Sequence, residues 1–125
     1  MILLTVDEIM ILHGKLIEAT GGLPGLRDRG LLESAAFSVD AGFDDIEQYP
    51  TAEEKAARLA YALIADHAFV DGNKRVGVLS MLMTLRLNGI VLHYTQKELI
   101  ELGLSAANGA WRYEEIYNWI MSHKE

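Results

Sequence analysis

The sequence contains no cysteine, and this absence excludes several chemistries together. Disulfide scaffolds, cysteine nucleophiles, iron–sulfur clusters and cysteine zinc sites all require that residue. A chain of 125 residues must then hold its core by packing alone. This is feasible at a length where roughly two-thirds of the unfolded chain's surface becomes buried. We therefore expect one domain over residues 1–125, in a reducing compartment.

Long apolar runs and a basic leader are also missing. The longest stretches without charge, such as 76–85, are shorter than the ~18 to 20 apolar residues that a membrane span needs. The opening residues 1–7 begin apolar but have no basic leader and no small-residue cleavage site, so we expect no signal peptide. The sequence predicts a cytoplasmic protein with no membrane partner.

Basic side chains are scarce. The 11 lysines and arginines stand against 18 acidic residues, which gives a net charge of −7. Proteins that bind duplex DNA neutralise phosphates with clustered basic side chains. The composition therefore disfavours direct nucleic-acid binding, although a small local anion site would not alter the overall charge.

The spacing T-x-x-E occurs at Thr5, Thr51 and Thr95. In this spacing the threonine hydroxyl accepts a hydrogen bond from an amide one turn on, and the glutamate reaches back. Each instance precedes apolar residues at three- and four-residue steps, the pattern of an amphipathic helix. Together with a helix capped by Asp28 and two further apolar segments, the pattern predicts six helices: 6–20, 29–39, 52–67, 74–87, 96–108 and 113–122.

Two connections are less regular than the others. The segment 42–50 is predicted as a loop, and 90–94 as either a brief strand or an extended link. There is no internal repeat and no linker rich in proline, glycine or serine. Short connections between successive helices indicate a compact all-α, bundle-like domain.

Nine residues carry the clearest chemistry, His67-Ala68-Phe69-Val70-Asp71-Gly72-Asn73-Lys74-Arg75. Asn73 is a good N-cap, which would place Lys74 and Arg75 in the first turn of the next helix. Free amides and the helix dipole make cations there unfavourable, by up to ~1 kcal/mol each. Because Gly72 also allows close backbone approach, the segment predicts an anion pocket that suits a phosphate.

His67 and Asp71 stand at the other side of this short loop. A neutral histidine can accept a hydroxyl proton, so His67 is a candidate general base. A carboxylate beside a phosphate pocket is a natural Mg²⁺ ligand, which is the role predicted for Asp71. The combination indicates transfer of a phosphoryl or nucleotidyl group to a hydroxyl. Phe69 is predicted to anchor the loop by burying its ring.

The segment resembles the Fic/Doc motif H-x-F-x-[D/E]-G-N-x-R, whose specified positions are matched by His67, Phe69, Asp71, Gly72, Asn73 and Arg75. The segment Gly21–Gly25 and the helix order resemble the Doc (death-on-curing) branch over nearly the whole chain. The resemblance implies a compact six-helix all-α Fic/Doc fold with the motif between two central helices. It also implies His67 as the base, Asp71 as the Mg²⁺ ligand, and contacts to the ATP phosphates from Gly72, Asn73, Lys74 and Arg75.

Two positions distinguish this chain from Fic adenylyltransferases, which usually have a second glycine where Lys74 stands and a second arginine where Val78 stands. The Doc resemblance implies a toxin of a toxin–antitoxin pair that acts as a protein kinase. Such toxins transfer the γ-phosphate of ATP to a threonine of elongation factor Tu and so inhibit translation. A bulky, charged Lys74 would narrow the nucleotide pocket and could reverse which phosphate faces His67. The runner-up is a Fic-type protein adenylyltransferase, which transfers AMP.

Regulation is predicted to come from outside the chain. The inhibitory string [S/T]-x-x-x-E-[G/N] of many Fic proteins is absent from the sequence. The Doc resemblance implies instead a small antitoxin whose C-terminal segment folds into a surface groove. A third hypothesis is a fold relic without catalysis that serves as a binding module.

Simpler interpretations stand beside these. His67 and Asp71 could be zinc ligands, but the other histidines, His13, His93 and His123, are scattered and offer no further pair. Lys74 and Arg75 could be ordinary solvated charges.

Two further features have a simple and a functional interpretation. The aromatic residues near the C-terminus, Trp111, Tyr113, Tyr117 and Trp119, are predicted to pack in the core rather than to stack on bases. The segment 43–50 is either plain surface or, by the resemblance, a flap that aligns the target peptide.

Overall fold

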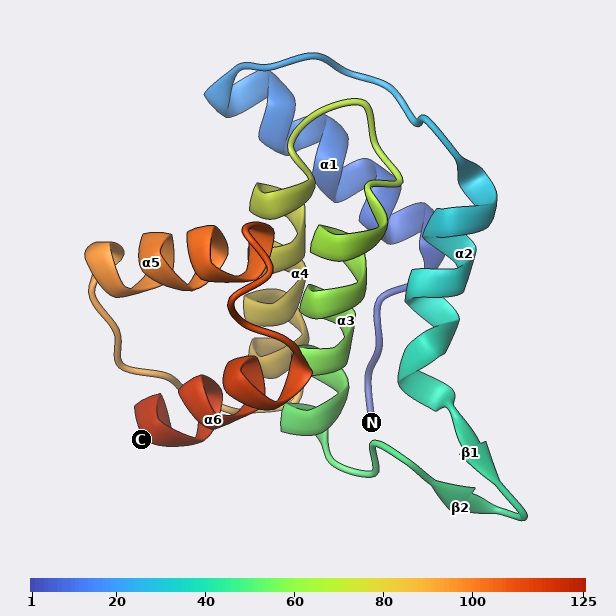
Figure 1. Ribbon diagram of the computed structural model, residues 1–125, viewed down its shortest axis with the longest axis vertical. Coiled ribbons are helices and arrows are strands. Elements are labelled where there is room, and N and C mark those ends of the chain that lie inside the picture. Colours follow the sequence, from blue (N-terminus) through green and yellow to red (C-terminus); the bar gives the residue numbers. More distant parts are fainter.

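The computed structural model describes residues 1–125 and contains six α-helices (Figure 1). The elements in chain order are α1 (Val6–Thr20), α2 (Arg29–Phe37), the 3₁₀ turn η1 (Ser38–Asp40), β1 (Gly42–Phe43), β2 (Ile46–Glu47), α3 (Ala52–Asp66), α4 (Asn73–Leu87), α5 (Gln96–Ala107) and α6 (Tyr113–His123). The all-α fold class predicted from the sequence is confirmed. None of these helices combines the length and the apolar character that a membrane crossing requires.

Helices α3 and α4 lie side by side at the centre, with α1 crossing one end, α2 on one flank, and α5 and α6 on the other (Figure 1). One glycine on α4, Gly77, and the alanines of α3 make the central contact close. A Cβ atom on Gly77 would lie 2.6 Å from Ile64 Cγ1 and 3.2 Å from the carbonyl oxygen of Ala60. The two helices that flank the motif loop are thereby held together next to that loop.

Helix starts follow the predicted capping pattern. Thr5, Thr51 and Thr95 each accept a hydrogen bond from the amide three residues on, and the glutamate at that position bonds back to the threonine amide. Asp28 caps α2 by accepting from the amide of Leu31. A cap of this kind contributes about 1 kcal/mol to helix stability, so the sequence itself sets where four of the helices begin.

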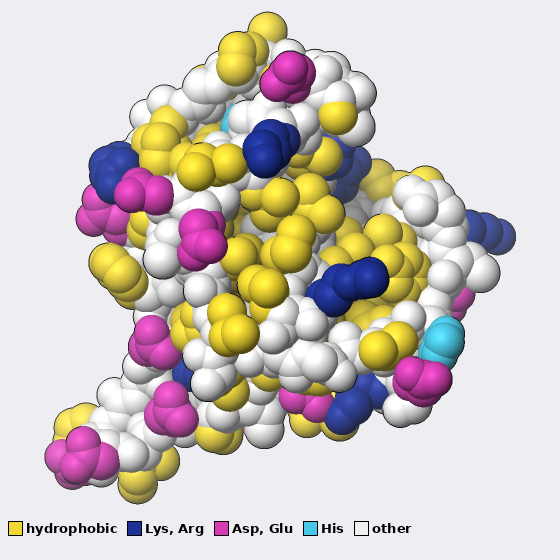
Figure 2. Space-filling model, turned by 180° about the vertical axis from the view of Figure 1, so that it is seen from behind, with side chains coloured by type: hydrophobic (Ala, Val, Ile, Leu, Met, Phe, Trp, Pro, Cys, Tyr) yellow, Lys and Arg dark blue, Asp and Glu magenta, His cyan; other side chains and the backbone are white.

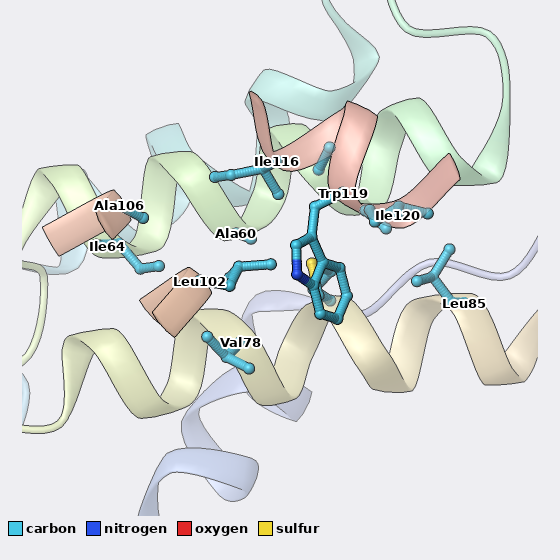
Figure 3. Close-up of a cluster of buried hydrophobic side chains, with 12 residues drawn as sticks. Ala60, Ile64, Val78, Leu85, Leu102, Ala106, Ile116, Trp119 and Ile120 are labelled. Atoms are coloured by element: carbon cyan, nitrogen blue, oxygen red, sulfur yellow. The ribbon is translucent and has the colours of Figure 1, made fainter. Parts of the chain in front are cut away.

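The core has two parts that meet at α3. One part joins α3 and α4 to α5 and α6, and Figure 3 shows Trp119 reaching from α6 towards α4 within it. The other part joins α3 to α1, α2 and the motif loop, and it includes Ile9, Leu32, Leu63 and Phe69. Burying each large apolar side chain stabilises the fold by about 1.5 to 3 kcal/mol. The second part therefore ties the motif loop to the rest of the molecule.

The segment 42–50 is not a plain loop as predicted. Residues 42–43 and 46–47 form a two-stranded antiparallel hairpin, with Gly42 opposite Glu47 and Phe43 opposite Ile46. Its turn places Asp44 and Asp45 at φ values of 50° and 63°. Aspartate tolerates this left-handed conformation, but Asp-Asp is a weaker turn signal than Asn-Gly or Asp-Gly. The hairpin lies at the opposite end of α3 from the motif loop (Figure 1), so this arrangement does not support a flap that reaches the motif.

The segment 90–94 is an extended link with one bridge. Leu92 pairs with Lys124 in an isolated antiparallel bridge, and the amide of His93 donates to the carbonyl of His123. The Lys124 ammonium reaches Glu53 on α3 at 2.6 Å. The end of the chain is thus fastened between α3 and the link that follows α4.

Candidate active site

The motif loop runs from His67, which ends α3, to Gly72, which precedes α4. A second segment, residues 25–28, lies alongside it as a short antiparallel partner. The amides of Arg27 and Asp28 donate to the carbonyl of Ala68 at 2.8 and 3.0 Å, and the amide of Val70 donates to the carbonyl of Gly25 at 3.1 Å. The loop backbone is therefore held by hydrogen bonds to the segment between α1 and α2.

His67 adopts an unusual backbone conformation for a residue with a side chain. Its φ and ψ are 52° and 50°, in the left-handed region, where it caps the C-terminal end of α3. Such a conformation is disfavoured by about 1 to 3 kcal/mol and persists where the surroundings hold it, often at functional sites. The imidazole is exposed and makes no hydrogen bond. The predicted base therefore faces solvent with both ring nitrogens available.

Phe69 and Asn73 fix the middle of the loop. The Phe69 ring is 3% exposed. Asn73 accepts from the amide of Phe69 at 3.0 Å and donates to its carbonyl at 2.9 Å, as a neighbouring strand would. The prediction that Asn73 caps α4 is wrong, because Gly72 occupies the cap position and Asn73 is the first helical residue. The Asn73 side chain is occupied by its hydrogen bonds to Phe69, so only the backbone amide of Asn73 is available to an anion.

The start of α4 has no side-chain cap, which leaves an anion-binding arrangement. Gly72 takes a left-handed φ of 76°, and its carbonyl accepts the first bond inside the helix, from Val76. The amides of Asn73, Lys74 and Arg75 have no hydrogen-bond partner. Unpaired amides and the positive end of a helix dipole attract a phosphate.

The side chains of Arg75 and Lys74 extend from the start of α4 in different directions. Arg75 donates from NH1 to the hydroxyl of Thr20 at 2.6 Å and to the carbonyl of Gly21 at 2.8 Å, both at the end of α1. The stem of Lys74 instead lies against α5, where a Cβ on Gly103 would be 3.1 Å from Lys74 Cγ. The Lys74 side chain is exposed and takes part in none of the ion pairs of the molecule. One cation is therefore fixed by α1, and the other remains free at the α5 side.

Asp71 is the carboxylate of the site. Its Oδ2 accepts from the amide of Leu23 at 3.0 Å and its Oδ1 from the amide of Gly72 at 2.8 Å. These two amides hold the pKa of the Asp71 carboxyl below its usual value, and Arg75, 4.0 Å away, lowers this pKa further. The carboxylate is thus kept ionised and in a fixed orientation.

A metal ion would have one protein ligand here. No group of three histidine, aspartate or glutamate side chains lies close enough to hold a metal. Mg²⁺ usually takes one or two protein carboxylates and completes its shell with phosphate oxygens and water. A single ionised carboxylate, 42% exposed and beside an anion pocket, fits Mg²⁺ that arrives bound to a phosphate. The arrangement does not fit a zinc site, which needs three or four protein ligands.

The sequence did not single out two residues that contact the site. His13 on α1 is 3% exposed, stacks on Phe69 and hydrogen-bonds the Asp71 carbonyl. Gly22 leaves no room for a side chain, because a Cβ there would lie 2.7 Å from Asp71 Oδ2 and 2.8 Å from Arg75 NH2. His13 had one signal in the sequence, a polar residue on the apolar face of α1. Gly22 had two signals, its place in a Gly-Gly pair after α1 and its place in the segment Gly21–Gly25 that resembles the Doc branch.

An apolar groove adjoins the site on the reverse face of the molecule, where Figure 2 shows apolar side chains gathered across the middle. One hollow of about 490 Å³ lies between α1, α4 and α5, with Lys74 and Arg75 in its lining. A second hollow of about 440 Å³ continues along α4 to Arg86 and Tyr94. The two share Leu79 and Leu82, so they form one groove, which we call the α4 groove.

Comparison with known proteins is consistent with this geometry. Residues 3–85 match the model of the Fic/DOC family. Over 103 residues, which make up 82% of this chain and 80% of the relative, the sequence is 35% identical to "Protein kinase doc" from Escherichia phage P1. It is 39% identical over 74 residues to "Toxin Doc" from Mycolicibacterium smegmatis, an alignment that spans 59% of this chain and 57% of that protein.

The matched residues contain the whole motif loop, all of α3, α4 up to Leu85, and the α1 contacts that surround Asp71 and Arg75. The chain therefore belongs to the Fic/DOC family, in its Doc branch.

Proposed function

We propose that this protein is a toxin of a type II toxin–antitoxin pair and transfers the γ-phosphate of ATP to a serine or threonine hydroxyl of a translation factor. The observation that carries the proposal is the uncapped start of α4, where three free amides and Arg75 surround Gly72. The relatives named as toxin and protein kinase support the same assignment. The Doc resemblance implies elongation factor Tu as the substrate. We therefore propose that the reaction takes place in the cytoplasm.

The proposed reaction uses the site residues as follows. The amides of residues 73–75 and the Arg75 guanidinium hold the phosphates of ATP. The target hydroxyl oxygen attacks the γ-phosphorus, the bond between the γ-phosphorus and the β–γ bridging oxygen breaks, and ADP leaves. His67 accepts the hydroxyl proton, since its ring is exposed and free of other hydrogen bonds.

Asp71 is the residue that would hold Mg²⁺ in this reaction. Bound to the phosphates, Mg²⁺ would supply neutralisation of the charge that develops on them. The chain's own contribution is the orientation of the Asp71 carboxylate, which the amides of Leu23 and Gly72 fix.

Lys74 supports phosphotransfer over adenylylation. Its stem lies against Gly103 and its side chain belongs to the lining of the α4 groove, beside the helix start proposed to receive the phosphates. A lysine in this place fills space and adds a positive charge where a glycine would leave room for a nucleotide. We propose that this charge favours the orientation in which the γ-phosphate, rather than the α-phosphate, faces His67.

The α4 groove is the proposed binding place of the antitoxin. It is lined mainly by apolar side chains and has Lys74 and Arg75 at one end and Arg86 at the other. A C-terminal antitoxin segment that combines apolar and acidic residues would complement this lining. A short reading frame for such a protein next to the toxin's own frame would support the pairing.

The test uses ATP labelled separately at the α and γ positions, incubated with the protein, Mg²⁺ and elongation factor Tu. We expect label from the γ position alone on the factor, and a loss of about 10²- to 10⁴-fold in the His67→Ala variant because the base is gone. Label from the α position would assign the protein to the adenylyltransferases. Label from neither position, with a folded wild-type protein that is as inert in cells as its His67→Ala variant, would point to a non-catalytic binding module.

A further inference from the structure

Two side chains from outside the motif form hydrogen bonds with the backbone at the two ends of the motif loop. Arg27 donates from Nε to the carbonyl of His67 at 2.7 Å and from NH2 to the carbonyl of Asp66 at 3.2 Å. His13 donates from Nε2 to the carbonyl of Asp71 at 2.7 Å. The residues at the two ends of the loop are the proposed base and the proposed metal ligand.

At the first end, Arg27 stabilises a conformation that is otherwise unfavourable. The carbonyls of Asp66 and His67 belong to the end of α3, where helical carbonyls lack partners inside the helix and favour a cation. His67 is in the left-handed region, with φ 52° and ψ 50°. By holding the carbonyl of His67, Arg27 fixes the direction in which the imidazole leaves the backbone.

At the second end, His13 acts through a hydrogen bond and a stacked ring. Its ring lies 3.8 Å from that of Phe69, with 12° between the planes. It is 3% exposed, so its polar Nε2 needs a partner inside the protein, and the carbonyl of Asp71 is that partner. Gly72 lies close above the ring, since a Cβ there would be 3.4 Å from Nε2. His13 therefore fixes the backbone between Phe69 and Gly72.

We propose that His13 and Arg27 are positioning residues for the transfer reaction: they orient the His67 imidazole and the Asp71 carboxylate before a nucleotide binds. Neither side chain touches the anion pocket formed by the amides of residues 73–75. Their effect therefore falls on the geometry of the base and the carboxylate and leaves the phosphate cradle in place. The catalytic part of this inference rests on the proposed function, whereas the effect on the loop backbone does not.

Two substitutions at His13 separate its hydrogen bond from its ring. His13→Phe keeps a ring against Phe69 and removes the donor, whereas His13→Gln keeps a donor at the reach of Nε2 and removes the ring. We expect kcat to fall about 10- to 100-fold in His13→Phe, the usual effect of losing a supporting hydrogen bond at such a site, with KM for ATP changed much less. His13→Gln is expected to recover most of kcat. If the role were only structural, His13→Gln would be no better than His13→Phe, and kcat would follow stability.

A second measurement does not depend on transferase activity. In the free protein, the amides of Leu23 and Gly72 are bonded to the Asp71 carboxylate. We expect their hydrogen exchange, followed by NMR, to accelerate in His13→Phe and to stay near the wild-type rate in His13→Gln. Unchanged exchange in His13→Phe would overturn the proposal.

Arg27 provides a second variant if His13→Phe does not fold. Arg27 is exposed, so Arg27→Gln is expected to fold and to lower kcat with little change in KM for ATP. Arg29→Gln, a nearby exposed arginine that pairs with Glu33 on its own helix, is the matched control and should leave kcat unchanged.

The outcomes distinguish this inference from the proposed function. A wild-type protein that transfers phosphate while its His13→Phe and Arg27→Gln variants keep full kcat would overturn the positioning roles and leave the function standing. A wild-type protein that transfers nothing would overturn the function, and amide exchange would still decide the positioning roles.

Discussion

At the scale of single residues, the site depends on contacts that Asp71 makes with three separate parts of the chain. Its carboxylate accepts from the amides of Leu23 and Gly72, and its carbonyl accepts from His13. A carboxylate with two amide donors is held in the ionised form, as the lowered pKa of Asp71 reflects. One residue therefore joins α1, the following segment and the motif loop.

Replacing Asp71 by asparagine should weaken the binding of Mg²⁺ at the site. We expect activity at limiting Mg²⁺ to fall at least about tenfold, because the neutral amide is a poor ligand and its NH₂ group cannot accept from the Leu23 or Gly72 amide. Measuring rate against Mg²⁺ concentration checks this. Asp66→Asn, which changes a carboxylate without a hydrogen-bond partner at the end of α3, is the control. If activity and Mg²⁺ dependence both survive in Asp71→Asn, the metal role is wrong.

The glycine pair after α1 allows a matched comparison. Gly21 and Gly22 have φ values of 87° and 116°, so alanine strains the backbone at both. An alanine Cβ at Gly21 would meet nothing within 4 Å, whereas at Gly22 it would meet Asp71 and Arg75. Both variants should lose at least about 1 kcal/mol of stability, measured by urea unfolding. Only Gly22→Ala should also raise KM for ATP, and equal kinetics in the two variants would argue against the packing described here.

At the scale of elements, α5 and α6 are joined by an ion pair that titrates. Glu98 Oε2 and His123 Nε2 are 2.5 Å apart. Hydrogen bonds from His123 and Thr95 lower the pKa of Glu98 to about 2. Burial alone would lower the pKa of His123, but the hydrogen bonds with Glu98 and the Trp119 carbonyl outweigh it and raise this pKa above 6.5.

The stability that this pair contributes should depend on pH in a defined way. The depressed pKa of Glu98 means that its contribution is present above about pH 4.5 and is lost as pH falls towards 2. The raised pKa of His123 means that its contribution is present below about pH 6.5 and is lost as pH rises through the raised value. Glu98→Gln, which keeps the helix-capping contact, should therefore destabilise most at about pH 5.5 and little at about pH 9. Urea unfolding at the two pH values tests this, and an equal loss at both would contradict it.

The helices were predictable because their signals are local. Three capping boxes and the apolar periodicity placed the helix starts within a residue or two, and the alanine-rich α3 indicated a helix that packs on several sides. The hairpin at 42–47 was missed, since it is two residues long on each strand and turns through Asp44 and Asp45. The prediction of Asn73 as an N-cap was wrong because an asparagine at this position can either cap the helix or hydrogen-bond the backbone of Phe69. Only the fold decides between the two.

At the scale of the whole molecule, the position of the motif loop is predictable from the sequence, whereas the distant residues that contact the loop are not. The nine-residue motif is contiguous, so its chemistry can be read without a fold. His13, Gly22 and Arg27 are distant in sequence and meet the motif only because α1 crosses the end of α3 and α4 (Figure 1). A net charge of −7 likewise gave no sign of the local cluster of Lys74, Arg75 and unpaired amides.

The α4 groove leads to a prediction about the antitoxin. Ile100 on α5 is 53% exposed and lines the groove, whereas Ile11 on α1 is 58% exposed and lines neither hollow. Ile100→Glu should weaken binding of the proposed antitoxin by at least about tenfold, and Ile11→Glu should not, because a buried charge without a partner is costly. Calorimetric titration of each folded variant with that antitoxin measures the difference. Equal affinities would place the antitoxin on another surface.

The central claim is that the motif loop directs the γ-phosphate of ATP to a protein hydroxyl through His67. The most direct measurement is the intact mass of elongation factor Tu after incubation with the protein, ATP and Mg²⁺. The account predicts a gain of one phosphoryl group with the wild-type protein and no gain with His67→Ala. A gain of one adenylyl group, or an unchanged mass with folded wild-type protein, would contradict it.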